Sequence, residues 1–557
     1  MIRAASGARC AAIASIAAIA AAVCIGCDDK GGARPAARAQ AITVGTALAA
    51  EQVLTRSLDA APSTLDPSLA TDVYAQCVLD DLFEGLTTQS PDGHIVPGVA
   101  SSWDVSADGK IWIFHLRPTA RWSNGEPLTA HDFVFGWRRT VDPRTAASYA
   151  QSVAPVENAF EIATGKRPVT DLGVDALDAH TLRVRLSAPA PYFPAVLADA
   201  WMYPQYEPAI KRYGDDWTRP EHIVGNGPFT LHEHVVGNRL TLERSPYYWD
   251  AAAVKLNRVV YDVIDDRNAQ AQRFLAGQLQ FVYTFPTTDR PWLAQQLGDQ
   301  VVTGPVFSTL MVGFNMQKPP FQHNRALRLA LAMSFDRNMI AQHVLYGAGY
   351  PTSSVMSPLE GYEQQLPDWA KLPTLQRYAL ARRLYHEAGY SVQHPLQVEM
   401  TYPSGDPVTE LVYEALAGMW RENLGAEVTL HPEEFKVLLQ NNRLHQNLLF
   451  HNGWFGDFPD PYTFMQLYTS GFDLNYNGYS NPRYDALVEA AGHEPDNNKR
   501  YRLFEQAERM LNDEAINVPV YYYASRHLIK PYVKGWASNS FDRNLSRYMY
   551  LLEHKGN

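Results

Sequence analysis

Two short segments carry residue types that could hold a metal or a phosphate. His232-Glu233-His234 has metal-ligating side chains, but it lacks the H-E-x-x-H spacing that places two imidazoles on one helix face. It lies in a strand-like run, where neighbouring side chains alternate between faces, so we interpret it as surface. Gly225-Asn226-Gly227-Pro228 is followed by no P-loop lysine and is typical of a turn.

Hydrolytic chemistry has no recognisable motif in this chain. There is no G-x-S-x-G and no S-x-x-K, and the Cys–His pairs lack any local catalytic signature. No set of residues assembles a nucleophile, a base and a group that orients the base. We therefore expect no catalytic residue, no bound metal and no cofactor.

An aromatic segment, residues 449–464 (LFHNGWFGDFPDPYTF), contains two aspartates. By spacing alone, Asp457 and Asp460 read as caps or turn residues in a stretch rich in proline and glycine.

The N-terminus predicts export. Residues 11–26 form an apolar stretch that is short for a membrane span and suits a secretory signal. Cys24-Ile25-Gly26-Cys27 resembles a bacterial lipobox, so we interpret residues 1–26 as a lipoprotein signal peptide and Cys27 as the lipidated residue. Asp28 resembles the signal that retains lipoproteins on the inner membrane. Ordinary signal-peptidase cleavage is the competing interpretation. Either way, the predicted location is the periplasm.

Predicted strands and helices alternate along the chain. Period-two patterns predict strands at 110–116, 181–186, 240–243 and 259–263. Helical periodicity predicts helices at 322–333, 374–388, 485–491 and 500–512, the second with Leu375, Tyr378, Leu380 and Leu384 on one stripe. The mixture predicts an α/β (mixed α+β) fold with more than one lobe.

Composition narrows the function classes. The 557 residues are 46% hydrophobic and 11% aromatic, which favours a large lined cavity. The net charge of −11 argues against nucleic acid as a partner, because phosphate binding needs a basic face. Four cysteines exclude a disulfide scaffold, and we expect Cys77 to be a lone buried thiol.

Residues 100–139 carry a block of motifs that extends to the rest of the chain. The block resembles the signature of the bacterial extracellular solute-binding family that serves peptide ABC transporters. Its matching elements are Trp103, Asp108-Gly109, Ile111–Arg117, Trp122-Ser123-Asn124-Gly125, Pro127-Leu128-Thr129-Ala130 and Asp132-Phe133. The resemblance continues in order over residues 50–553, through DLFEGL at 81–86, NMQKPPF at 315–321 and VPVYYY at 518–523. Within the family the chain most resembles the oligopeptide-binding proteins.

The resemblance implies a periplasmic-binding-protein-like clamshell of two lobes, which closes on a ligand and delivers it to an inner-membrane permease. It divides the chain into a tether at 27–50, a first lobe at 51–83, 208–308 and 525–557, an extra subdomain at 84–207 and a second lobe at 309–524. The lobes would be connected near 306–310 and 523–526. A monomer is expected, since delivery to one permease needs no symmetry.

The resemblance also implies a ligand site. In the family, a Trp and an Asp three positions later lie in the cleft, and the Asp pairs with the α-ammonium of a bound peptide. The matching residues are Trp454 and Asp457, with Gly453 offering backbone polar groups. Val73 and Tyr74 match positions that line the cleft, although the first turn of a core helix would explain them equally well. Asp460 keeps its interpretation as a turn residue.

The chain departs from its relatives where several of them bind the ligand's C-terminal carboxylate. His451, Ala332 and Val408 align with their basic side chains, and none is permanently charged. Thr71 aligns with a glutamate of some members. We therefore expect a weak demand for a free C-terminus at one fixed length, which suits longer peptides or a cell-wall (murein) peptide. A sensory co-receptor, a binder of another ligand of the family and a secreted peptidase are the alternatives.

Overall fold

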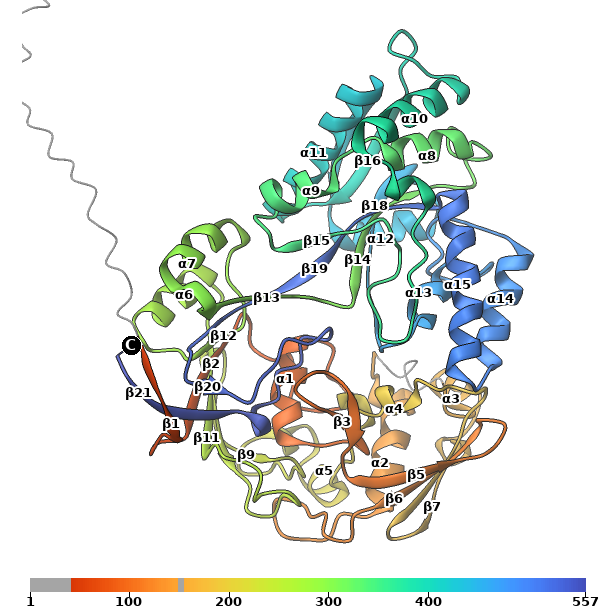
Figure 1. The fold of residues 1–557 in the computed structure, drawn as a ribbon. Helices are drawn as coiled ribbons and strands as arrows, with labels where there is room; N and C mark the ends of the chain where they lie inside the picture. Colours follow the sequence, from red (N-terminus) through yellow and green to blue (C-terminus); the bar gives the residue numbers. More distant parts are fainter. Residues whose placement is uncertain (1–41, 149–154, 557) are drawn as a thin grey trace, which may run out of the picture. The chain divides into compact units, whose positions relative to one another are not determined.

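The computed structural model describes residues 42–148 and 155–556, and a twelve-stranded mixed sheet runs through them. Figure 1 shows its strands, and the hydrogen-bonded order is β17 (Glu427–Glu433), β16 (Gln397–Pro403), β18 (Leu449–Phe455), β14 (Ser308–Phe314), β19 (Asn517–Ile529), β12 (Phe281–Val282), β2 (Val53–Leu58), β11 (Arg258–Val263), β10 (Arg239–Arg244) and β9 (Phe229–Val235). Two further strands, β13 (Val301–Pro305) and β15 (Gly349–Pro351), pair with β19.

Strand β19 joins the two halves of this sheet (Figure 1). Its first part, up to Tyr523, pairs with β14 and β15, whereas residues from Ala524 onward pair with β13 and β12. The other chain segment that passes between the halves is Val306-Phe307, and the Val306 N–H donates to the Tyr523 carbonyl at 2.8 Å. The two crossings are therefore hydrogen-bonded to each other.

Three hydrophobic clusters follow this division. One collects buried residues from Leu54 to Phe281 together with Ile529–Leu551. The other two are built from residues between Phe307 and Tyr521. Most buried side chains of each half thus pack among themselves. Away from the crossings the halves also touch, because the ring of Tyr192 stacks on Phe458 and on Tyr462.

Three smaller sheets accompany the large one. They are β5 (Ala100–Val105), β6 (Ile111–Leu116), β8 (Thr181–Arg185) and β7 (Val174–Asp178); β1 (Thr43–Leu48), β21 (Tyr550–Lys555) and β20 (Val533–Lys534); and β3 (Thr87–Gln89) with β4 (Ile95–Pro97). The principal helices are α1 (Val73–Leu82), α2 (Ala130–Val141), α6 (Arg267–Leu275), α7 (Arg290–Leu297), α8 (Arg325–Met333), α10 (Thr374–Glu387), α11 (Pro407–Leu424), α12 (Phe435–Arg443), α14 (Pro482–His493) and α15 (Asn497–Glu514). Among the described helices, none is long and apolar enough to cross a membrane.

The predicted strands and helices are all found, with boundaries shifted by a few residues. The stripe predicted for the helix at 374–388 is right in part, because Leu380 and Leu384 are half-buried and pack against a core cluster. Leu375 is 82% exposed, and the buried residues of α10 are Ala381 and Tyr385, because the helix packs against α8 along that line. The predicted mixture of α and β structure is confirmed.

The predicted tether is also too long. Thr43–Leu48 forms β1, because it pairs with β21 at the far end of the chain, a partner that local composition does not reveal. The predicted signal peptide, its Cys27 lipidation site and most of the tether lie outside the described residues.

Candidate functional site

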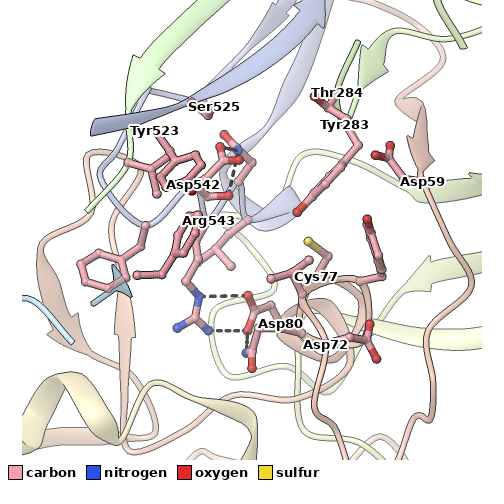
Figure 2. Close-up of a pocket in the computed structure, with 18 of the residues that line it drawn as sticks. Asp59, Asp72, Cys77, Asp80, Tyr283, Thr284, Tyr523, Ser525, Asp542 and Arg543 are labelled. Carbon is pink, nitrogen blue, oxygen red and sulfur yellow. Dashed lines mark hydrogen bonds and ion pairs between the residues drawn. The ribbon is translucent and has the colours of Figure 1, made fainter. Parts of the chain in front are cut away.

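The main cavity considered for a ligand lies beside the crossings and has a volume of about 490 Å³. Figure 2 shows it from close by. Most of its wall comes from three parts of the chain: the start of α1, the region of β19 around residues 523–526, and the loop at 541–545. Thr71 and Phe455 also line it.

An ion-pair cluster forms one wall of this main cavity. The guanidinium of Arg543 lies 2.6 Å from Asp80 and 2.9 Å from Asp199 (Asp80 in Figure 2). Two carboxylates therefore share one cation. Burial raises the pKa of Asp199 to about 7, Arg543 opposes that rise, and the charges of Asp80 and Asp457 add to it.

A second cavity, of about 360 Å³, contains Asp457 in its wall. Asp199 and Trp201 line both cavities, so the two are neighbours. Asp457 is exposed as a whole residue, yet partial burial of its carboxylate raises its pKa. Among the described residues, no basic side chain forms an ion pair with it. Asp457 is thus a partly desolvated carboxylate in the wall of a cavity.

The buried Thr463 holds Asp457 and Trp454 together. Its hydroxyl donates to Oδ2 of Asp457 at 3.0 Å. It accepts from the Trp454 indole N–H at 3.2 Å and from the Asp457 backbone N–H at 3.1 Å. Every hydrogen-bonding position of the hydroxyl is used. Sequence reasoning missed Thr463, because a threonine six residues beyond an aspartate has no distinctive pattern.

The other predicted residues of this segment lie on β18. The backbone of Gly453 faces the edge of β18 that β14 does not pair, since Gly456 N–H points to the β14 side and directions alternate along a strand. His451 shares its Nδ1 hydrogen with, or accepts from, the Tyr413 hydroxyl at 2.7 Å, and burial lowers its pKa to about 4. His451 is therefore a neutral group at neutral pH.

Val73 and Tyr74 fit both interpretations, as residues that line a cavity and as the first turn of a helix. They form the first turn of α1, and both line the main cavity. Tyr74 packs edge-on against Tyr283, with ring centroids 5.4 Å apart. The structure therefore brings Val73 and Tyr74 to the main cavity and Asp457 to its neighbour, while His451, Gly453 and Trp454 line neither of the two.

Two interpretations of individual residues are corrected. Asp460 is more than a turn residue, because it forms a fully buried ion pair with Arg500 as well as accepting from the Tyr462 N–H. Tyr523 also lines the main cavity. Cys77 lines this cavity too, and the residue is half-buried rather than buried. Desolvation of its thiol nevertheless raises the thiol pKa to about 12.

The chain is similar to proteins of one family over most of its length. A sequence model of the bacterial extracellular solute-binding proteins, family 5 (middle region), matches residues 94–513. Three relatives from Escherichia coli (strain K12) match as follows: the periplasmic oligopeptide-binding protein OppA, 35% identical over 92% of this chain and 95% of OppA; the periplasmic murein peptide-binding protein MppA, 35% identical over 92% and 95%; and the probable deoxycholate-binding periplasmic protein YgiS, 36% identical over 92% and 96%.

The fold is shared with solved structures of the same kind. The unliganded open form of the periplasmic murein tripeptide-binding protein MppA superimposes with a TM-score of 0.84 at 35% identity, covering 92% of this chain and 99% of that one. The predicted family resemblance and the two-lobe fold class are confirmed.

Proposed function

This chain belongs to the bacterial extracellular solute-binding proteins of family 5, and we propose that it is the substrate-binding component of a peptide ABC importer. It binds short peptides between two lobes and delivers them to an inner-membrane permease. It acts as a monomeric binder without catalysis, in the periplasm, held at the inner membrane by a lipid on Cys27.

The observation that carries this proposal is the state of Asp457. Its carboxylate is oriented by Thr463, faces a cavity and has no cationic partner among the described residues. Every unblocked peptide carries an α-ammonium whatever its side chains, so an oriented and partly desolvated carboxylate binds peptides without reading their sequence. The open edge of β18 at Gly453 supplies backbone groups that an extended peptide can pair with.

The domain boundaries belong to the same proposal. Residues 51–83, 208–308 and 525–557 form the first lobe, 84–207 the extra subdomain and 309–524 the second lobe, with β1 added to the first. The change of partners along β19 and the separate hydrophobic clusters support this division. The two crossings then provide the hinge about which the lobes close.

Native mass spectrometry of the purified chain, stripped of carried-over ligand, tests the proposal. The ligands are a pool of two- to eight-residue peptides in free and N-acetylated forms, a murein tripeptide, and deoxycholate. We expect the wild type to retain free but not acetylated peptides, because acetylation removes the charge that pairs with Asp457. Asp457→Ala should lose them, Thr463→Val should bind about tenfold more weakly, and the exposed control Asp513→Ala should behave as wild type.

Equal retention of free and acetylated peptides would make Asp457 a structural residue. Binding of deoxycholate with no peptide would contradict the proposed ligand class. Selective retention of the murein tripeptide would narrow the ligand to cell-wall peptides, as the name of MppA suggests for that relative.

A further inference from the structure

One end of the main cavity holds two arginines from different elements. Arg526 lies on β19 just beyond its change of partners, opposite Thr303, and its Nε donates to the Phe285 carbonyl at 3.2 Å. Arg267 is the first residue of α6, and its Nε donates to Asp59 at 2.9 Å. Among the described residues, no carboxylate lies within ion-pair distance of Arg526.

The surroundings of Arg526 are unfavourable for a lone cation. Burial lowers the pKa of Arg526, and the like charge of Arg267 lowers it further, although a guanidinium remains charged at neutral pH. Asp59 is already engaged, because it accepts from Arg267 and from the Gln270 amide at 2.9 Å. This end of the cavity therefore has two guanidinium groups for one carboxylate.

The other charged groups that line the main cavity have their partners. Asp80 and Asp199 are paired with Arg543. Asp542 lies 2.6 Å from Nε2 of His527, whose Nδ1 lies 2.7 Å from the Tyr283 carbonyl. Asp542 also accepts from the Asn544 amide at 3.1 Å.

The last carboxylate, Asp72, caps α1 by accepting from the backbone N–H groups of Ala75 and Ser63. Figure 2 places Asp59 and the Asp80–Arg543 pair on different sides of Tyr283. The cavity thus has excess negative charge at its Arg543 end, next to Asp457, and excess positive charge at its Arg526 end.

We propose that Arg526, assisted by Arg267, selects peptides that present a carboxylate to this end of the main cavity. The inference rests on the proposed function and specifies the ligand further. A guanidinium offers a planar fork of N–H donors that fits a carboxylate with two parallel hydrogen bonds. Within the described part of the chain, the Arg526 side chain donates only through Nε. The same chemistry can come from an acidic side chain or from the peptide C-terminus.

The opposite charges at the two ends favour one ligand orientation. The α-ammonium lies at Asp457, beside Asp199, and the carboxylate lies further along the peptide, at Arg526. The expected weak demand for a free C-terminus followed from the uncharged positions of His451, Ala332 and Val408. Arg526 is not one of those positions, so it provides an additional cation.

Isothermal titration calorimetry of the purified full-length chain tests this inference. Peptides are compared in pairs that differ only in Glu or Gln at one position, and in pairs that differ only in a free or amidated C-terminus. The variants are Arg526→Gln, which removes the charge, and Arg526→Lys, which keeps the charge but loses the fork. Arg502→Gln is the control, because Arg502 is exposed on α15 and its side chain pairs with no carboxylate among the described residues.

In at least one of the two kinds of pair, we expect the peptide with the carboxylate to bind about tenfold or more tightly than its neutral partner. This should hold for the wild type and for Arg502→Gln. Arg526→Gln should bind both members equally, and Arg526→Lys should lie between. A Glu/Gln difference identifies a side chain as the source, and an acid/amide difference identifies the C-terminus.

Equal binding of all pairs by the wild type, or the same discrimination in Arg526→Gln, would overturn the inference. If peptides still require a free ammonium in that case, the proposed function stands and only the role of Arg526 fails. If no peptide binds at all, both fail.

Discussion

Single residues in this chain show how a buried polar group is kept satisfied. Thr463 orients Asp457 and Trp454 with one hydroxyl, and the fully buried Glu508 is surrounded by donors in the same way. Tyr362 and the Gln365 N–H donate to Oε2 of Glu508, and Ser354 lies against Oε1. No cation pairs with Glu508 among the described residues, and burial raises its pKa to about 7.

Glu508→Gln should stabilise the protein at alkaline pH and not at acidic pH. The folded pKa, about 7, lies above the unfolded value near 4.5, so the stability that Glu508 contributes is complete below pH 4.5 and is lost as the pH rises through 7. A glutamine can keep every partner of Glu508. Its carbonyl accepts from Tyr362 and the Gln365 N–H, and its amide donates to the Ser354 hydroxyl, which then donates to the Met356 carbonyl. We expect a gain of about 3 kcal/mol in the free energy of unfolding at pH 8 and under about 1 kcal/mol at pH 5.

Urea denaturation at the two pH values, followed by tryptophan fluorescence, measures this difference. The exposed Glu489→Gln on α14 is the control and should change neither value. An equal effect of Glu508→Gln at both pH values would contradict the assigned protonation of the buried carboxyl.

At the scale of elements, the start of α1 serves structure and ligand site together. Asp72 is its N-cap and accepts from the Ala75 N–H at 2.8 Å. The next two residues, Val73 and Tyr74, line the main cavity. The hydrogen bond that caps the start of α1 therefore also positions the part of the cavity wall formed by Val73 and Tyr74.

Asp72→Ala should reduce both stability and ligand affinity, whereas the matched change Asp496→Ala should reduce stability alone. Asp496 caps α15 through the Lys499 N–H at 3.0 Å and lines none of the described cavities. Loss of either cap costs about 1 kcal/mol. Only the first lets the cavity wall at Val73 and Tyr74 fray, so we expect peptide affinity to fall several-fold. Denaturation and calorimetry on both variants check this, and equal affinities would show that the cap does not position the wall.

For the molecule as a whole, β19 carries the connection between the two halves of the sheet. The partners of β19 change between Tyr523 and Ala524, where the Val306 N–H of the other crossing bonds to the Tyr523 carbonyl. Both crossings thus meet at one place, which allows rigid halves to rotate with few backbone changes.

Peptide binding should therefore make the protein more compact. We expect the radius of gyration from small-angle X-ray scattering to decrease when a free peptide is added to the wild type, because closure brings the lobes together on the ligand. Asp457→Ala at the same peptide concentration should give the scattering curve of the ligand-free protein. A bound wild type with an unchanged curve would contradict closure.

The family, the succession of strands and helices, and Trp454 and Asp457 as candidates for the site could all be predicted from the sequence. Its motifs are local, and the period of hydrophobic residues reports which face of an element is covered. Even so, the stripe at Leu375 was misjudged, because the packing partner α8 is not visible in the pattern of α10.

Only the tertiary structure decided which charges meet. The cluster of Asp80, Asp199 and Arg543 joins three segments far apart in the chain, and Arg526 faces a cavity because β19 changes partners beside it. The hydroxyl of Thr463 and the pairing of β1 with β21 depend on distance in space in the same way. Electrostatic attraction and hydrogen bonding act over a few ångströms. The order of residues in the sequence does not give the distance in space between residues that are far apart along the chain.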